Sequence, residues 1–343
     1  MIKLFMNGEK EFLTRFPECI YVSVDNAKAI EFLLKKNKIL QENEEIDRLS
    51  IAGEGNMNIV LRAKTNQRSF IIKQSRPWVA KYPQITAPIE RVNVEAEFIK
   101  LTLQHDDLNQ YSPILIGHIP SHFLLILEDL GEISDFSVVY QGAKVTSEDL
   151  SNFATYLDAL HAIEVLYFPD NLEMRTLNHE HIFHFPFQKD NGLNLDEIQQ
   201  GLANAAMPVI ENLILINRIA ELGKVYLKND HKRLIHGDFY PASFLKTNSG
   251  IKVIDAEFAF LGPKEFDWAV LLAHLMMSDQ PVEVVNEFVS LFTPNRNLDT
   301  QLILAFAGVE ILRRLLGVAQ LPLNTTIAKK TVWIDNSINW IMN

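Results

Sequence analysis

The 343-residue sequence predicts an α+β fold in which a small β-rich lobe precedes a larger helical lobe. Short apolar runs between turn residues fill the chain up to about Leu130, a pattern typical of strands. Beyond about Thr146 the apolar residues recur at the spacing of an α-helix. The segment between them contains Gly131 and Gly142 and has the composition of a connector. We therefore expect two lobes, residues 1–130 and 131–343.

The β-rich lobe is expected to combine five strands with two helices. Asp25 is placed to cap the first helix, over 26–40, and a second helix is predicted over 94–103. The strands are expected at residues 49–51, 59–62, 70–73, 113–117 and 122–127. A polar turn separates the second strand from the third, so these two should form a hairpin.

The helical lobe begins with a clear start signal. Thr146 and Asp149 have the spacing of a capping box, and the helix that they open should end near Ile163. A long periodic stretch over 195–227 contains Pro208, where we expect a kink or a break. Further helices are predicted over 265–278, 282–292, 298–316 and 325–341.

Composition narrows the classes of partner. Acidic residues outnumber basic ones by 43 to 32, and no cluster of Lys and Arg is visible, so we expect no nucleic-acid partner. Cys19 is the single cysteine, which excludes an intrachain disulfide and fits a reducing compartment. Charged residues interrupt the N-terminal apolar residues, and the apolar run 123–127 is far too short to cross a bilayer. We expect a cytoplasmic protein without a membrane partner.

The most informative motif is a pair of carboxylates, Asp238 and Asp255, each delivered by an apolar segment. Gly237 allows a tight turn before Asp238, and a short polar hairpin separates the two segments. We therefore expect the two carboxylates at the ends of neighbouring strands, facing one site. Phosphoryl transfer to a hydroxyl needs such a pair, because one carboxylate orients and deprotonates the hydroxyl while another holds Mg²⁺ on the phosphates.

A second motif lies upstream, where a glycine-containing loop, 52–58, joins two predicted strands. The backbone N–H groups of such a loop can bind phosphate oxygens. Lys73 lies in the next strand, where a kinase has a lysine that pairs with the phosphates and with a helix glutamate. Both Glu95 and Glu97 are candidates for that glutamate, and the sequence leaves the choice open.

With these motifs in order, the sequence from about Ile46 to about Leu323 resembles the aminoglycoside phosphotransferase-like kinases. This family includes choline, homoserine and methylthioribose kinases, and methylthioribose kinase looks closest. The resemblance rests on Gly53–Asn58, on the lysine strand and the Arg91–Glu95 helix start, on Glu128–Leu130, on Asp255–Phe260 and on Arg313–Arg314. It implies a two-lobed protein-kinase-like fold, with ATP bound in the cleft and Mg²⁺ as the metal.

The same resemblance assigns roles to individual residues. Asp238 would be the catalytic base. The metal would be held by Asp255, Glu257 and Ser243, the last at the position where protein kinases have a metal-binding asparagine. ATP would be bound by Gly53, Gly55, Asn56, Asn58, Lys73, Glu95, Glu128 and Leu130, the hinge through its backbone. Arg313, Arg314 and Tyr240 would bind the acceptor.

The resemblance implies a kinase whose acceptor is 5-methylthioribose or a related sugar. Two alternatives stay open: an aminoglycoside or amino-alcohol acceptor, which would favour carboxylates over arginines near Asp238, and a nucleotide-binding pseudokinase used for interaction. A homodimer is possible.

Several residues depart from the family pattern or carry a structural alternative. The usual segment after the catalytic aspartate is replaced by Phe239–Ala242, next to where the acceptor should sit, so specificity could differ. Adjacent helix residues point about 100° apart, so at most one of Arg313 and Arg314 need face a pocket. Pairing of these arginines with Glu310 is the alternative. For His236 we expect a structural role, its ring bonding a backbone carbonyl to hold the loop.

Overall fold

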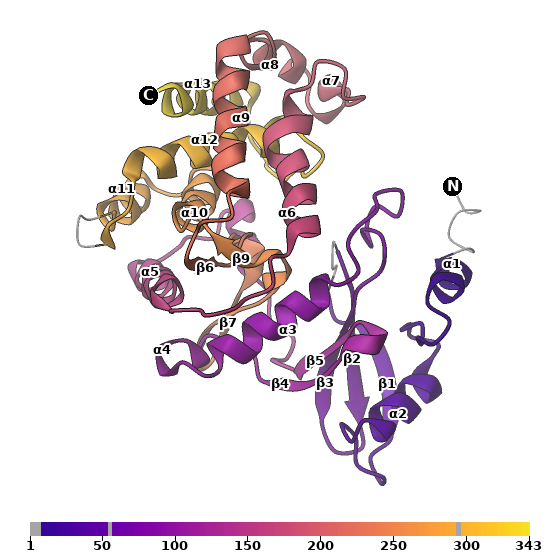
Figure 1. Ribbon diagram of the computed structural model, residues 1–343. Helices are drawn as coiled ribbons and strands as arrows, with labels where there is room; N and C mark the ends of the chain where they lie inside the picture. Colours follow the sequence, from indigo (N-terminus) through magenta and orange to yellow (C-terminus); the bar gives the residue numbers. More distant parts are fainter. Residues whose placement is uncertain (1–7, 54–56, 293–295) are drawn as a thin grey trace. The chain divides into compact units, whose positions relative to one another are not determined.

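The computed structural model describes residues 8–53, 57–292 and 296–343 (Figure 1). These residues divide into two compact units. Unit 1 comprises 8–105 and Ser112–Glu132, and unit 2 comprises Asp106–Tyr111 and Ile133–Asn343. The short helix α4 (Asp106–Asn109) thus belongs with the helical unit, although it precedes the last strands of the β-rich one.

Unit 1 is built on a five-stranded antiparallel sheet with the order β1-β2-β3-β5-β4 (Figure 1). Its strands are β1 (Ile46–Ile51), β2 (Ile59–Thr65), β3 (Ser69–Gln74), β4 (Leu115–Ile119) and β5 (Leu124–Glu128). The hairpin predicted between the second and third strands is present as β2–β3. Lys73 pairs with Val60 on β2 and with Leu125 on β5, so it lies in the middle of the sheet.

Helices cover both faces of this sheet. They are α1 (Gly8–Arg15), α2 (Ala27–Lys36) and α3 (Arg91–Thr102), with the 3-10 turn η2 (Pro120–His122). Because strand side chains alternate between faces, Phe70 and Ile72 pack with α2 while Leu125 packs with α1 and α3. α2 is shorter than predicted at both ends. Asn26 takes the N-cap position expected for Asp25, and Lys38 has a positive φ of 57° that the helix cannot contain.

Unit 2 is mainly helical. Its longer helices are α5 (Ser147–Ala162), α6 (Leu172–His179), α8 (Leu202–Ile210), α9 (Leu213–Leu227), α10 (Glu265–Met277), α11 (Val282–Ser290), α12 (Thr300–Leu316) and α13 (Ile327–Met342). Shorter pieces are α7 (Leu195–Ile198), the 3-10 turns η3 (Phe136–Gln141), η5 (Phe185–Phe187), η6 (Pro241–Ser243) and η7 (Ala256–Phe258), and the π-helical segment η4 (Glu180–His184). The capping box of Thr146 and Asp149 is confirmed at the start of α5.

The stretch over 195–227 is broken differently from the prediction. Pro208 lies inside α8, and the chain leaves helical structure at Gln199–Gly201 and at Glu211–Asn212. Gly201, with a φ of 89°, is the N-cap residue of α8, and the Asn212 side chain accepts a hydrogen bond from Leu215 N, which starts α9. The interruptions between α7, α8 and α9 therefore follow from local turn and cap residues and not from the proline.

The core of unit 2 forms where α10, α12 and α13 pack together. α12 is buried along almost its whole length from Ile303 to Leu316, and α10 from Phe266 to Leu275. Any charged group on these two helices is therefore taken out of water and needs a partner. None of the described helices is both long and apolar enough to span a membrane.

Two small antiparallel sheets also belong to unit 2: β6 (Arg233–Ile235) pairs with β9 (Phe260–Gly262), and β7 (Phe244–Thr247) pairs with β8 (Gly250–Val253). The expectation that Asp238 and Asp255 follow neighbouring strands is wrong in this detail. Asp238 follows β6 and Asp255 follows β8, and these strands are in different sheets. The two segments are instead joined by the Ile254 backbone N–H, which donates to the Ser243 carbonyl at 3.0 Å.

Candidate active site

The loop that carries Asp238 is fastened by a buried carboxylate. Asp267 on α10 is fully buried and accepts hydrogen bonds from the backbone N–H groups of His236 at 2.8 Å and of Gly237 at 3.0 Å. Gly237 has a φ of 80°, and a Cβ there would overlap the carbonyl oxygen of Phe258. A glycine is therefore required one residue before Asp238, and the backbone that presents this carboxylate is fixed from two sides.

The structural role expected for His236 is confirmed. Its ring is buried, and Nε2 lies 3.0 Å from the carbonyl oxygen of Ile254, one residue before Asp255. Ser243 closes the same loop, since its hydroxyl donates to the Asp238 carbonyl at 2.8 Å. These contacts hold the segments of Asp238 and Asp255 in one place.

Phe239 does not face the acceptor, contrary to the expectation for the altered segment. Its side chain is fully buried and stacks on Tyr156 with ring centroids 5.4 Å apart, and Phe244 lies against it at 4.4 Å. Tyr240 points elsewhere, to Arg314 and His274. Alternate residues of the loop thus take different sides, so Phe239 anchors the loop and Tyr240 is the altered residue that lies beside the arginines.

Both arginines of α12 approach Asp238. Nη2 of Arg313 lies 3.7 Å, and Nη2 of Arg314 3.6 Å, from the same oxygen of Asp238. Burial raises the pKa of Asp238 to about 6, although Arg314 and Arg313 act in the opposite direction, and Glu310 and Asp255 raise it further. The carboxylate is ionised at neutral pH, yet it is far more basic than an exposed aspartate.

The sequence argument required at most one of the two arginines to face inward, but both are buried. Arg313 and Arg314 are 6% and 7% exposed, and their Nε atoms donate to the two oxygens of Glu310 at 2.5 and 2.8 Å. Long guanidinium side chains three and four residues after Glu310 converge on it, whatever the angle between their Cα–Cβ bonds. Both arginines therefore pair with Glu310 and also approach Asp238.

The residues expected to hold Mg²⁺ supply oxygen atoms, the donors this ion prefers. Asp255 follows β8 in the left-handed region, with a φ of 64°, which aspartate tolerates better than most residues. Glu257 and Ser243 are buried, at 4% and 1% exposure. Among the described residues, no group of three or more His, Cys, Asp or Glu side chains is arranged so that it could hold a metal ion by itself. This donor set fits an ion such as Mg²⁺, which keeps waters and substrate oxygens as further ligands.

In unit 1, the open choice between the two glutamates is resolved. Lys73 Nζ lies 2.5 Å from Oε2 of Glu95, and both side chains are almost completely buried. Glu97 is exposed and pairs with Lys100 at 2.6 Å. Arg91, one turn before Glu95, donates to the carbonyl oxygens of Arg76 and Met57, so the start of α3 also fastens the end of the glycine loop.

We expect Glu95→Gln to raise the KM for ATP at least tenfold, while Glu97→Gln leaves it unchanged. Removing one partner of a buried ion pair leaves a buried charge uncompensated, which costs about 3–5 kcal/mol, so Lys73 should lose its position. Steady-state kinetics and melting of the two variants check this expectation. Equal ATP KM values in both would show that the Lys73–Glu95 pair does not orient a phosphate-binding lysine.

The other expected nucleotide contacts are placed only in part. Gly53 and the buried Asn58 belong to the described ends of the glycine loop, whereas Gly55 and Asn56 lie outside the described residues. In the hinge, the backbone N–H of Glu128 donates to the Ile114 carbonyl at 3.0 Å. That N–H is therefore not available to adenine, and the expected backbone contact of Leu130 stays a prediction.

The sequence assigned no role to three residues behind the site: Asp267, His274 and Tyr140. Asp267 and His274 lie on α10, where every residue from Phe266 to Leu275 is buried. A carboxylate and an imidazole in such an apolar helix were the available signal, because buried polar groups are kept where they have partners. Tyr140 gives no such signal, since buried tyrosines are common in cores.

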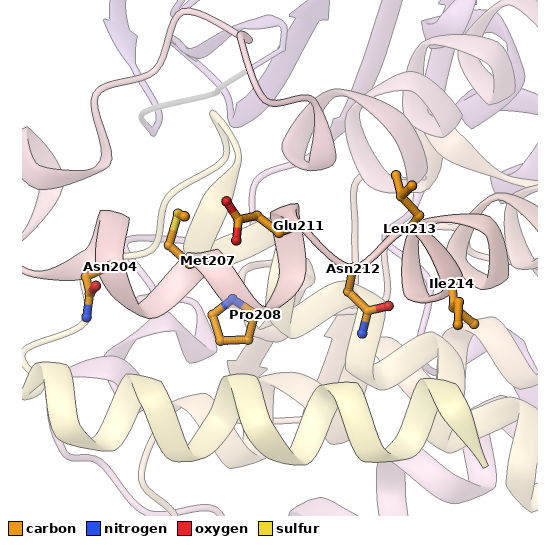
Figure 2. A pocket seen from close by; sticks show the side chains of 7 residues that line it. All are labelled: Asn204, Met207, Pro208, Glu211, Asn212, Leu213 and Ile214. Atoms are coloured by element: carbon orange, nitrogen blue, oxygen red, sulfur yellow. The ribbon is translucent and has the colours of Figure 1, made fainter.

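A separate surface hollow lies away from these groups. Figure 2 shows that its lining comes from α8, the start of α9 and the junction between them, with Met207, Leu213 and Ile214 as its exposed apolar side chains. Glu211 is the one charged residue that lines it. This composition offers no pair of groups for phosphoryl transfer, so the chemistry is expected at Asp238 instead.

Known proteins were compared with the chain by sequence and by fold. No family model matches it. A methylthioribose kinase of Exiguobacterium sibiricum is 22% identical, and the match covers 82% of this chain and 83% of that protein. A spectinomycin phosphotransferase, solved with ADP and spectinomycin, has a TM-score of 0.53 at 14% identity. The match covers 94% of this chain and 98% of the phosphotransferase. A choline kinase of Streptococcus pneumoniae has a TM-score of 0.50, also at 14% identity, over 92% and 99% of the two chains.

These findings confirm the resemblance inferred from the motifs. They also account for the order of the elements, a β-rich unit with the lysine and glutamate pair followed by a larger helical unit with the aspartates. The chain is similar to methylthioribose kinases over most of its sequence, and its fold is the protein-kinase-like fold of choline kinase and the spectinomycin phosphotransferase.

Proposed function

We propose that this chain is an ATP-dependent kinase that transfers the γ-phosphoryl group to a hydroxyl of a small sugar, with Asp238 as the base. The observation that carries the proposal is the setting of Asp238. Its backbone is fixed by Asp267, its pKa is raised to about 6, and two buried arginines lie 3.6–3.7 Å from its carboxylate. A base with a pKa just below neutral is ionised and still accepts a proton readily.

The remaining groups match the needs of phosphoryl transfer, which depends on positioning and on neutralising charge. Lys73, held by Glu95, would contact the phosphates. Asp255, with Glu257 and Ser243, would hold Mg²⁺, and this ion when bound would neutralise charge on the phosphates. Asp238 would accept a hydrogen bond from the acceptor hydroxyl, orient it and take its proton.

The charges around Asp238 favour a neutral acceptor. Arg313 and Arg314 balance Asp238 and Glu310, and the guanidinium groups lie on the same side as the base. A cationic amino alcohol or aminoglycoside would meet two like charges at close range in a partly buried site, where repulsion is strong. Sugar hydroxyls, in contrast, can accept hydrogen bonds from guanidinium N–H groups. We therefore propose 5-methylthioribose, or a sugar of the same kind, as the acceptor.

Replacing Arg313 or Arg314 with Ala should raise the KM for 5-methylthioribose about ten- to a hundredfold, because hydrogen bonds from charged donors contribute about 1.5–3 kcal/mol. The KM for ATP should hardly change. Arg296→Ala is the matched control, since Arg296 pairs with Asp158. If both variants melt at a lower temperature but keep the parental acceptor KM, the arginines are structural and the sugar assignment is lost.

The rate should fall on the acid side with an apparent pKa near 6. Burial raises the pKa of Asp238 to that value, so the carboxylate is protonated below it and kcat/KM should drop about tenfold per pH unit. The same shift predicts that the contribution of Asp238 to the free energy of unfolding grows as the pH falls from about 6 toward the ordinary pKa of an aspartate. In that range the folded state binds the proton and the unfolded state does not. A profile that stays flat down to pH 5 in folded enzyme would contradict the role of Asp238.

A further inference from the structure

A chain of buried polar groups runs from Tyr140 to the arginine pair. The hydroxyl of Tyr140 lies 2.5 Å from Nδ1 of His274, and Nε2 of His274 lies 3.0 Å from Oε1 of Glu310. Glu310 in turn receives the Nε–H groups of Arg313 and Arg314. His274 and Glu310 are both fully buried. The proposed reaction does not use the first three of these residues, so their hydrogen bonds need an explanation.

The direction of each hydrogen bond follows from the charges. Burial alone would raise the pKa of Glu310, but Arg313 and Arg314 hold it well below its ordinary value, so the carboxylate is ionised and can only accept. Burial lowers the pKa of His274 to about 4, so this ring is neutral. A neutral ring that donates from Nε2 to Glu310 must accept at Nδ1, and Tyr140 is the donor there.

This arrangement determines which part of each guanidinium is free. Both Nε–H groups are used by Glu310, and the Nη2 atoms of both arginines lie toward Asp238. Their distances of 3.6 and 3.7 Å exceed those of a hydrogen bond. Glu310 and Asp238 therefore compete for the same two cations, and Glu310 makes the closer contacts.

We propose that Glu310 is a positioning residue: together with His274 and Tyr140 it holds both guanidinium groups by their Nε atoms, which keeps them from closing on Asp238 and leaves their Nη2 groups for the acceptor hydroxyls. This inference rests on the proposed function. Without Glu310, two buried cations would have Asp238 as their nearest anion and would bind it directly. The base would then be blocked and the acceptor would lose its donors.

Tyr140→Phe tests the chain at its far end, because it removes only the hydroxyl that lies beside His274 Nδ1 and keeps the ring. We expect the KM for 5-methylthioribose to rise about three- to tenfold, the effect of one weakened hydrogen bond, with an unchanged KM for ATP. Tyr156→Phe is the matched control: Tyr156 is equally buried in the same unit, and its hydroxyl has no hydrogen-bond partner. Glu310→Gln should act in the same direction and more strongly, by tenfold or more, since its amide cannot accept from both arginines and His274.

Nitrogen-15 NMR gives a readout that needs no turnover. At pH 7 the His274 ring should be the neutral Nε2–H tautomer, and its Nδ1 signal should shift in Tyr140→Phe but not in Tyr156→Phe. A charged ring, the Nδ1–H tautomer, or an unchanged acceptor KM in folded Tyr140→Phe and Glu310→Gln would overturn the inference. If the parent enzyme does not phosphorylate 5-methylthioribose, the proposed acceptor fails, whereas the spectra still decide whether the chain of hydrogen bonds holds the arginines.

Discussion

Asp238→Asn is expected to lower turnover by about 10²-fold or more, the usual scale for the loss of a general base. The amide keeps the shape of the side chain, and the backbone contacts of Asp267 and Ser243 do not involve the carboxylate of Asp238. The loop should therefore keep its position, and ATP should bind as before. Turnover with saturating ATP and 5-methylthioribose measures the effect.

Melting of the same variant separates lost catalysis from lost structure. The raised pKa of Asp238 means that the folded protein disfavours its charged form, so the neutral amide should leave stability at pH 7 equal or higher. Asp230→Asn is the control, because Asp230 is a surface residue paired with Lys228 in the same unit. Near-parental turnover in Asp238→Asn would remove this residue from its role.

Asp255→Asn should lose Mg²⁺-dependent turnover by about 10²-fold or more, since a bound metal contributes several kcal/mol to stabilising charge in the transition state. Asn tolerates the positive φ at this position, so the change removes charge without straining the backbone. Asp279→Asn is a matched control, as Asp279 also has a positive φ, of 56°. An Mg²⁺ titration of Asp255→Asn that superimposes on that of the parent would show that Asp255 is not a ligand.

Much of the fold was predictable because local signals were strong. The polar turn between the second and third strands gives the β2–β3 hairpin, and the capping box of Thr146 and Asp149 starts α5 where expected. The loop of Asp238 was recognisable because Gly237 occupies a position that no other residue fits. Signals of this kind act within a few residues, so they survive without knowledge of the packing.

What the sequence did not reveal depends on contacts between distant segments. The choice of Glu95 over Glu97 follows from which face of α3 is buried against the sheet. Phe239 turns inward because its ring stacks on Tyr156, a residue of a distant segment, and packs against Phe244 five residues further on. An argument from helix geometry alone does not predict that both arginines converge on Glu310, because the long side chains bend toward a buried charge.

The central claim is tested most directly by incubating the purified chain with labelled ATP, Mg²⁺ and one acceptor at a time: 5-methylthioribose, choline and spectinomycin. The account predicts transfer of the γ-phosphoryl group to 5-methylthioribose, isolated as the sugar phosphate, and little or none to the two cationic acceptors. Asp238→Asn in the same assay should form no more than about a hundredth of that product. Transfer to choline or spectinomycin with none to the sugar would contradict the acceptor assignment, and no transfer to any hydroxyl compound would contradict the kinase itself.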